Sequence, residues 1–87
     1  MHKYQIELKP SAKKELSKIN NQDAQKISIA IDKLVNNPFP VGYKKLKANE
    51  NKYRIRVGNY RVIYNIDSNI VTILILKIGH RKNVYHT

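Results

Sequence analysis

The chain lacks cysteine altogether and has only six acidic side chains among its 87 residues. Without cysteine, a disulfide framework and a thiolate metal site are excluded, and the composition suits a reducing cytosol. A long apolar run is also missing, because Ile70 to Leu76 is interrupted by Thr72 and is far too short to span a bilayer. The amino terminus is charged from His2 onwards, which predicts no signal peptide. We therefore predict one small cytoplasmic domain over residues 1–87.

Basic residues dominate the charge. Seventeen lysines and arginines give a net charge of +11, which implies an acidic partner: nucleic acid, an anionic membrane or an acidic protein. No basic amphipathic helix with Trp or Phe anchors is present, so a membrane partner is disfavoured. Residues 52–87 carry seven basic side chains against Asp67 alone. Nucleic acid is the favoured partner.

Residues 52–65 alternate in a pattern that predicts a β-hairpin with a tight turn at Gly58-Asn59, a pair that tolerates positive φ. Counting outward from that turn fixes the register. The residues that pair on one face are all apolar or aromatic: Val57 with Tyr60, Ile55 with Val62, and Tyr53 with Tyr64.

The other face of this hairpin sets Arg56 opposite Arg61, with Arg54 on the diagonal and Lys52 one pleat further out. Like charges directly opposite each other destabilise a sheet by about 0.2–1 kcal/mol per pair. No acidic residue lies between Lys52 and Tyr64 to compensate. Arginine keeps its charge and presents a planar fork that matches phosphate. We therefore predict an anion site on this face; the alternative is a basic strand face that is merely solvated.

The rest of the chain predicts a strand, two helices and a last strand. Tyr4 to Leu8 alternates as a half-buried strand, a short helix follows Pro10, and Asn20-Asn21 ends it and caps a second helix that reaches Asn36-Asn37. That second helix has one apolar stripe, expected to face the core: Ala24, Ile27, Ile31, Leu34 and Val35.

An irregular connection after Pro38 carries Lys44, Lys45 and Lys47, which either belong to a solvated loop or extend the basic face. After the hairpin and a turn at Asp67-Ser68-Asn69, Ile70 to Ile78 is a nearly continuous apolar strand, typical of a central strand covered on both faces. The predicted fold is α+β with the order β-α-α-β-β-β: a two-helix antiparallel hairpin packed on a small, mainly antiparallel four-stranded sheet.

This element order, the segment Y-R-I-R-V-G-N-Y-R-V-I-Y (Tyr53 to Tyr64) and the ending I-G-H-R-K-N-V-Y (Ile78 to Tyr85) resemble the RelE/ParE superfamily of toxins from toxin–antitoxin systems. The likeness covers essentially the whole chain and is greatest to the RelE branch. The resemblance implies an enzyme that cuts mRNA in the ribosomal A site without a metal or other cofactor. It also implies an acidic, RelB-like antitoxin as partner, together with the ribosome and mRNA.

The family's basic catalytic residues fall on Arg54 and Arg56 in the first hairpin strand, on Arg61 in the next strand and on Arg81 after the last strand; the family's terminal tyrosine falls on Tyr85. The resemblance thus implies that these residues are catalytic. Basic residues around them are assigned to RNA binding: Lys44, Lys45, Lys47, Lys52 and Lys82.

One departure concerns the general base. RelE proteins often carry lysine at the positions of Arg54 and Arg56, and arginine does not lose its proton in proteins. His80 is the expected substitute, because histidine titrates near neutrality and it directly precedes Arg81. An exposed loop histidine is the alternative interpretation, and Lys52 and Lys82 are reserve candidates for the base.

Two other functions remain open at this point. The ParE branch of the superfamily poisons DNA gyrase on the same scaffold, and a small basic chain can also bind RNA or the ribosome without catalysis. Arg81→Ala separates binding from catalysis, because a mere binder loses one phosphate contact, whereas a ribonuclease loses its rate and keeps its affinity.

Overall fold

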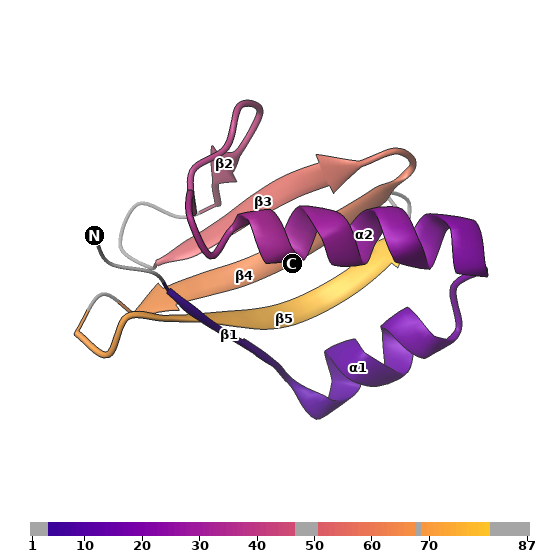
Figure 1. Ribbon diagram of the computed structural model, residues 1–87, viewed down its shortest axis with the longest axis horizontal. Helices are drawn as coiled ribbons and strands as arrows, with labels where there is room; N and C mark the ends of the chain where they lie inside the picture. Colours follow the sequence, from indigo (N-terminus) through magenta and orange to yellow (C-terminus); the bar gives the residue numbers. More distant parts are fainter. Residues whose placement is uncertain (1–3, 47–50, 68, 81–87) are drawn as a thin grey trace.

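The computed structural model describes residues 4–46, 51–67 and 69–80. A five-stranded sheet carries two helices on one of its faces (Figure 1). The elements follow each other as β1 (Gln5–Leu8), α1 (Pro10–Ser17), α2 (Asn21–Lys33), β2 (Lys44–Lys45), β3 (Lys52–Val57), β4 (Tyr60–Asp67) and β5 (Thr72–His80). In space the strands are ordered β1-β5-β4-β3-β2, and only β1 and β5 run parallel. Within the described part of the chain, neither helix has the length and apolar character needed to cross a membrane.

The β3–β4 hairpin has the predicted register. Val57 pairs with Tyr60 and Arg56 with Arg61 on either side of the turn. Gly58 takes a φ of +60° and Asn59 does not take a positive φ, which is the pattern of a type II′ turn with glycine in its first central position. Because the strand period is two, this turn alone decides which residues share each face.

Both helices begin where the sequence predicts. Pro10 is the first residue of α1, and the Asn20 side chain caps α2 by accepting a hydrogen bond from the Asp23 N–H at 2.9 Å. The stripe of α2 is buried through Ile27, Ile31 and Leu34. These side chains join the apolar faces of β3, β4 and β5 in one core, in which Tyr64 is the largest fully buried side chain.

The structure corrects the predicted strand count and two boundaries. A two-residue strand, β2, adds a fifth strand because Lys44 and Lys45 pair with Arg54 and Tyr53. α2 ends at Lys33, and a turn of i→i+3 hydrogen bonds carries the chain on through the predicted end. β5 begins at Thr72 rather than Ile70, since the Asp67 carboxylate accepts the backbone N–H groups of residues 69 and 70 and thereby extends the turn.

Candidate nucleic-acid interface

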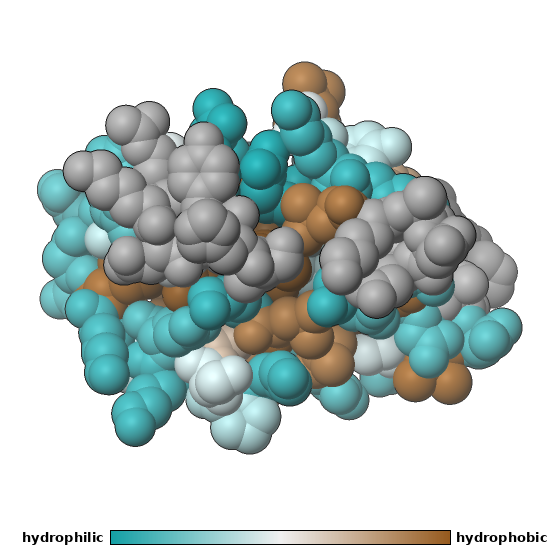
Figure 2. Space-filling view, turned by 180° about the vertical axis from the view of Figure 1, so that it is seen from behind, coloured by the Kyte–Doolittle hydropathy of each residue, from teal (hydrophilic) through white to brown (hydrophobic). Residues whose placement is uncertain are grey.

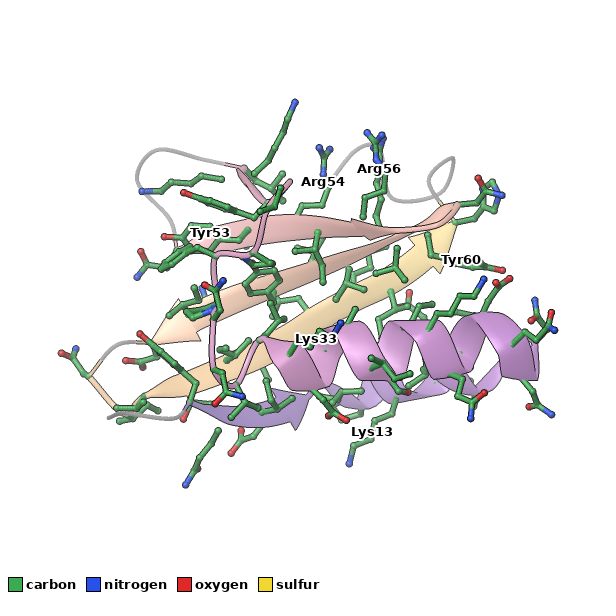
Figure 3. The ribbon with its side chains drawn as sticks, turned by 45° about the horizontal axis from the view of Figure 1, so that its top comes forward. Lys13, Lys33, Tyr53, Arg54, Arg56 and Tyr60 are labelled. Atoms are coloured by element: carbon green, nitrogen blue, oxygen red, sulfur yellow. The ribbon has the colours of Figure 1, made fainter. Side chains whose placement is uncertain are left out.

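The face of the sheet opposite the helices carries two rows of side chains across the strands. In one row Arg56 of β3 lies opposite Arg61 of β4, which lies opposite Gly79 of β5. Figure 3 shows Arg54 and Arg56 pointing away from the helices, on the same side of β3. We call Arg54, Arg56 and Arg61 together the arginine face. The predicted placement of these three arginines on one face of the hairpin is therefore present in the structure.

Their burial differs in a way that the sequence does not indicate. Arg56 is exposed and Arg54 is half-buried, whereas Arg61 is only 7% exposed. Seen from this side, hydrophobic residues gather near the centre of the molecule and hydrophilic residues surround them (Figure 2). A side chain as little exposed as Arg61 is poorly screened by water, so Arg61 interacts with a nearby anion more strongly than a surface arginine does.

The second row extends the arginine face toward the sheet edge. Lys44 of β2 lies opposite Arg54, and Arg54 lies opposite Ile63. Lys45, one residue further, pairs with Tyr53 and so belongs to the other face. Lys52 pairs with Asn65 and is half-buried. Of these three lysines predicted to bind RNA, Lys44 and Lys52 therefore share the arginine face and Lys45 does not.

A β-bulge in β5 decides where His80 lies. Before the bulge, Ile73 and Ile75 lie on the helix side, where they pair with buried residues of β4. The register then shifts between Ile63 and Tyr64, which gives β5 one extra residue. After the bulge, Ile78 is therefore the β5 residue on the helix side. The extra residue reverses the alternation of all that follows. His80 consequently pairs with Tyr60.

The rings of Tyr60 and His80 meet at 5.7 Å in an edge-to-face arrangement. Tyr60 packs against the core on the helix side, so the structure does not bring His80 to the arginine face. His80 instead borders a hollow of about 370 Å³ between the end of α1 and the end of β5, lined also by Glu15, Lys18 and Ile19. This position is the main difference between the predicted and the observed site.

Four predicted site residues, Lys47, Arg81, Lys82 and Tyr85, lie outside the described residues. Within residues 4–46, 51–67 and 69–80, no three side chains of His, Asp or Glu come together as metal ligands would.

An aromatic cluster that the sequence does not predict lies at the other end of the hairpin. Phe39 contacts Tyr43 and Tyr53 with ring centroids 5.2 Å apart in each case, and Tyr53 stacks on Tyr64 at 5.8 Å. The buried Tyr64 hydroxyl donates a 2.6 Å hydrogen bond to the Pro38 carbonyl. Burial, and then the neighbouring tyrosines, raise the pKa of Tyr64 well above the usual tyrosine range. The only signal in the sequence is the close spacing of Phe39 and Tyr43, with Phe39 between two prolines.

Comparison with known proteins agrees with this architecture. A family model described as the ParE toxin of type II toxin–antitoxin system matches residues 6–85. Toxin RelE3 of Methanocaldococcus jannaschii is 36% identical over 76 residues, which cover 83% of this chain and 84% of that relative. Toxin RelG of Mycobacterium tuberculosis is 28% identical over 83 residues, covering 94% of this chain and 95% of that relative.

Among solved structures, the archaeal RelE–RelB complex from Pyrococcus horikoshii OT3 superimposes with a TM-score of 0.81 at 27% identity, covering 91% of this chain and 96% of that chain. The toxin–antitoxin complex RelBE2 from Mycobacterium tuberculosis gives a TM-score of 0.80 at 25% identity, covering 91% and 99%. The fold and the family model thus give the same result. This chain belongs to the RelE/ParE superfamily, the toxins of type II toxin–antitoxin systems.

Proposed function

We propose that this protein is a ribosome-dependent endoribonuclease that cleaves mRNA in the A site and thereby inhibits translation. The observation that carries the proposal is the arginine face, where Arg56 and Arg61 lie directly opposite each other with Arg54 on the same side. Such a pair costs folding energy, and an RNA phosphodiester is an anion that offsets it. A relative named as a RelE toxin supports the same activity.

In the proposed reaction the ribose 2′-hydroxyl attacks the adjacent phosphorus atom, a 2′,3′-cyclic phosphate forms, and the 5′-oxygen leaves with a proton. The pentacoordinate phosphate carries extra negative charge, which pre-positioned cations stabilise more than they stabilise the substrate. We assign this role to Arg56 and Arg61, with Arg54 and Arg81 holding the flanking backbone. Tyr85 is proposed to stack on a base. None of these roles requires a metal ion or other cofactor.

His80 and Lys52 are the two candidates for the general base among the described residues. His80 has the appropriate chemistry but pairs with Tyr60 on the helix side, whereas Lys52 lies on the arginine face. If His80 is the base, the single-turnover rate of the parent on programmed ribosomes rises with pH across the range in which histidines lose their proton, and His80→Ala removes that rise. A His80→Ala variant that cuts at the parent rate transfers the role to a lysine, for which Lys52→Met is the next variant.

We further propose that an acidic, RelB-like antitoxin binds this toxin in the cytoplasm and neutralises it. Two of the similar structures are complexes of a RelE with a RelB protein, which supports such a partner. The net charge of +11 is the physical reason to expect acidic side chains in the antitoxin where it meets the arginine face.

The test is induction of the toxin in cells, followed by primer extension on actively translated transcripts. We expect cuts inside codons for the parent and a loss of cutting by orders of magnitude for Arg56→Ala and Arg61→Ala. Lys33→Ala, on α2 on the other side of the molecule (Figure 3), is the control and should cut like the parent. Cuts that persist in both arginine variants contradict the proposed roles.

The family model that matches this chain describes a ParE toxin, so poisoning of DNA gyrase is the second candidate. The same induction experiment separates the two. Growth arrest with intact transcripts and a DNA-damage response favours the gyrase target. Intact transcripts without DNA damage leave a basic protein that binds RNA or the ribosome without cutting.

A further inference from the structure

The loop between α2 and β2 exposes a group of apolar side chains. Phe39 is 43% exposed, Tyr43 is 41% exposed, and Val41 between them is fully exposed. Single exposed apolar residues are common on soluble proteins. Here, however, the rings of Phe39 and Tyr43 have centroids 5.2 Å apart and form one continuous surface. We call Phe39, Val41 and Tyr43 the loop patch. It lies where the chain leaves α2 and approaches the edge of the sheet at β2 (Figure 1).

The loop patch rests on a rigid base. The Phe39 ring meets Tyr53 edge-on at 5.2 Å, and Tyr53 stacks on the fully buried Tyr64. The hydroxyl of Tyr64 in turn holds the carbonyl of Pro38, immediately before Phe39, at 2.6 Å. The exposed rings are therefore fixed before any ligand arrives, so little conformational entropy is lost when one binds.

The charge beside the loop patch indicates which ligand it suits. Lys44 and Lys45 follow Tyr43 directly and are both exposed, and no acidic residue occurs between positions 33 and 49. Lys45 pairs with Tyr53 and so lies on the face that the loop patch contacts, whereas Lys44 pairs with Arg54 on the arginine face. Positive charge therefore stands on both faces of this sheet edge, beside the loop patch. Exposed aromatic rings beside cations are the usual means of holding unpaired nucleotides, because the rings stack on bases and the cations contact phosphates.

We propose that the loop patch stacks an unpaired RNA base, while Lys44 and Lys45 contact the adjoining phosphates. This would be a second RNA contact, separate from the cleavage centre. It rests on the proposed function only in taking RNA as the ligand and does not require cleavage. An mRNA segment beside the cleaved codon and an unpaired ribosomal RNA base offer the same chemistry, and the experiment distinguishes them.

The experiment measures binding of purified toxin to a labelled single-stranded 2′-O-methyl oligoribonucleotide, which cannot be cleaved, and separately to small ribosomal subunits. Phe39→Leu and Tyr43→Leu keep apolar area but remove the ring, and each should weaken binding by about fivefold or more, the lower end of measured base stacking. Tyr43→Phe keeps the ring and should bind like the parent. Ile70→Ala, at a 65% exposed apolar residue elsewhere, is the matched control.

Two further measurements make the inference specific. Lys44→Gln should lower the slope of log affinity against log salt by about 0.7 for single-stranded RNA, the effect of one phosphate contact. A duplex of the same sequence should not distinguish the leucine variants from the parent, since its bases are already stacked. Circular dichroism and the unfolding midpoint verify that each variant is folded.

The outcomes divide clearly. Weaker binding of the leucine variants to the oligonucleotide assigns the loop patch to mRNA, and weaker binding to the ribosomal subunit alone assigns it to ribosomal RNA. Parent-like binding of folded leucine variants to both ligands overturns the inference, as does an equal loss on duplex RNA. Loss of antitoxin affinity alone assigns the loop patch to a protein partner and also overturns it. Because binding is measured without cleavage, failure of the ribonuclease proposal leaves this result intact.

Discussion

Replacing Arg56 by glutamate should make the protein more stable and abolish its activity. Arg56 lies directly opposite Arg61, and like charges at facing strand positions repel each other. Removing a like-charge pair from facing strand positions gains about 0.2–1 kcal/mol, and an opposite-charge pair adds a similar amount. We therefore expect Arg56→Glu to raise the free energy of unfolding by about 1 kcal/mol, or the melting temperature by about 4–8 °C for a domain of this size.

Urea and thermal unfolding of purified variants provide the assay, and a charge-matched control is essential. Any glutamate lowers the net charge of +11 by two and so relieves general repulsion. Lys52→Glu makes the same change on the same strand and face, but its cross-strand neighbour is Asn65. The difference between the two variants isolates the effect of facing Arg61.

Two results would refute this reasoning. If Arg56→Glu is no more stable than the parent, the facing arginines carry no folding cost. If Lys52→Glu gains as much as Arg56→Glu, the cost is one of net charge and not of this pair. In either case the arginine face would no longer be a site that the sequence maintains at the expense of stability, and the principal support for the ribonuclease proposal would be lost.

Two further perturbations test the fold. Asn20→Ala removes the cap of α2 and should lower the free energy of unfolding by about 1 kcal/mol, measured in urea, whereas Asn20→Ser should restore most of it. Tyr64→Phe should cost about 1–3 kcal/mol by leaving the Pro38 carbonyl without its hydroxyl donor. Because the pKa of Tyr64 is raised in the folded state, its contribution is complete below about pH 10 and declines above it, so the stability gap between the parent and Tyr64→Phe should narrow as the pH rises beyond that value.

What the sequence predicts well is set by local rules. The turn at Gly58-Asn59 and the strand period of two place Arg56 opposite Arg61, and Asn20 caps α2 through a neighbour three residues away. These features depend on residues close together in the chain. Their periodicity and turn chemistry are therefore sufficient to predict them.

What the sequence does not predict depends on contacts between distant residues. If β5 alternated without interruption, His80 would share a face with Arg61, because Ile73 and Ile75 would put the even-numbered residues there. The bulge opposite Ile63 and Tyr64 reverses this order, and it arises from pairing between two strands. The β2 strand and the aromatic contacts of Phe39 likewise form only when the loop after α2 packs against β3.

The bulged end of β5 is held by a side chain of α1. Beyond Leu8, β1 no longer accompanies β5, and there the Glu15 carboxylate of α1 accepts the Ile78 N–H at 2.8 Å across 63 residues of sequence. A side chain thus replaces a strand neighbour just before His80. Glu15→Ala leaves this half-buried donor without its charged acceptor, which should cost about 1.5–3 kcal/mol, whereas Glu15→Gln keeps an acceptor and should cost less.

Amide hydrogen exchange gives the local measurement. In Glu15→Ala the Ile78 amide should exchange much faster than in the parent, while the Ile63 amide in β4 changes only as far as global stability falls. Glu15→Gln should lie between the two. If the Ile78 amide is equally protected in parent and Glu15→Ala, the carboxylate does not hold the strand end. If the Ile78 amide loses its protection in Glu15→Ala, the positions of Gly79 and His80 depend on α1, and mRNA cleavage by that variant should fall.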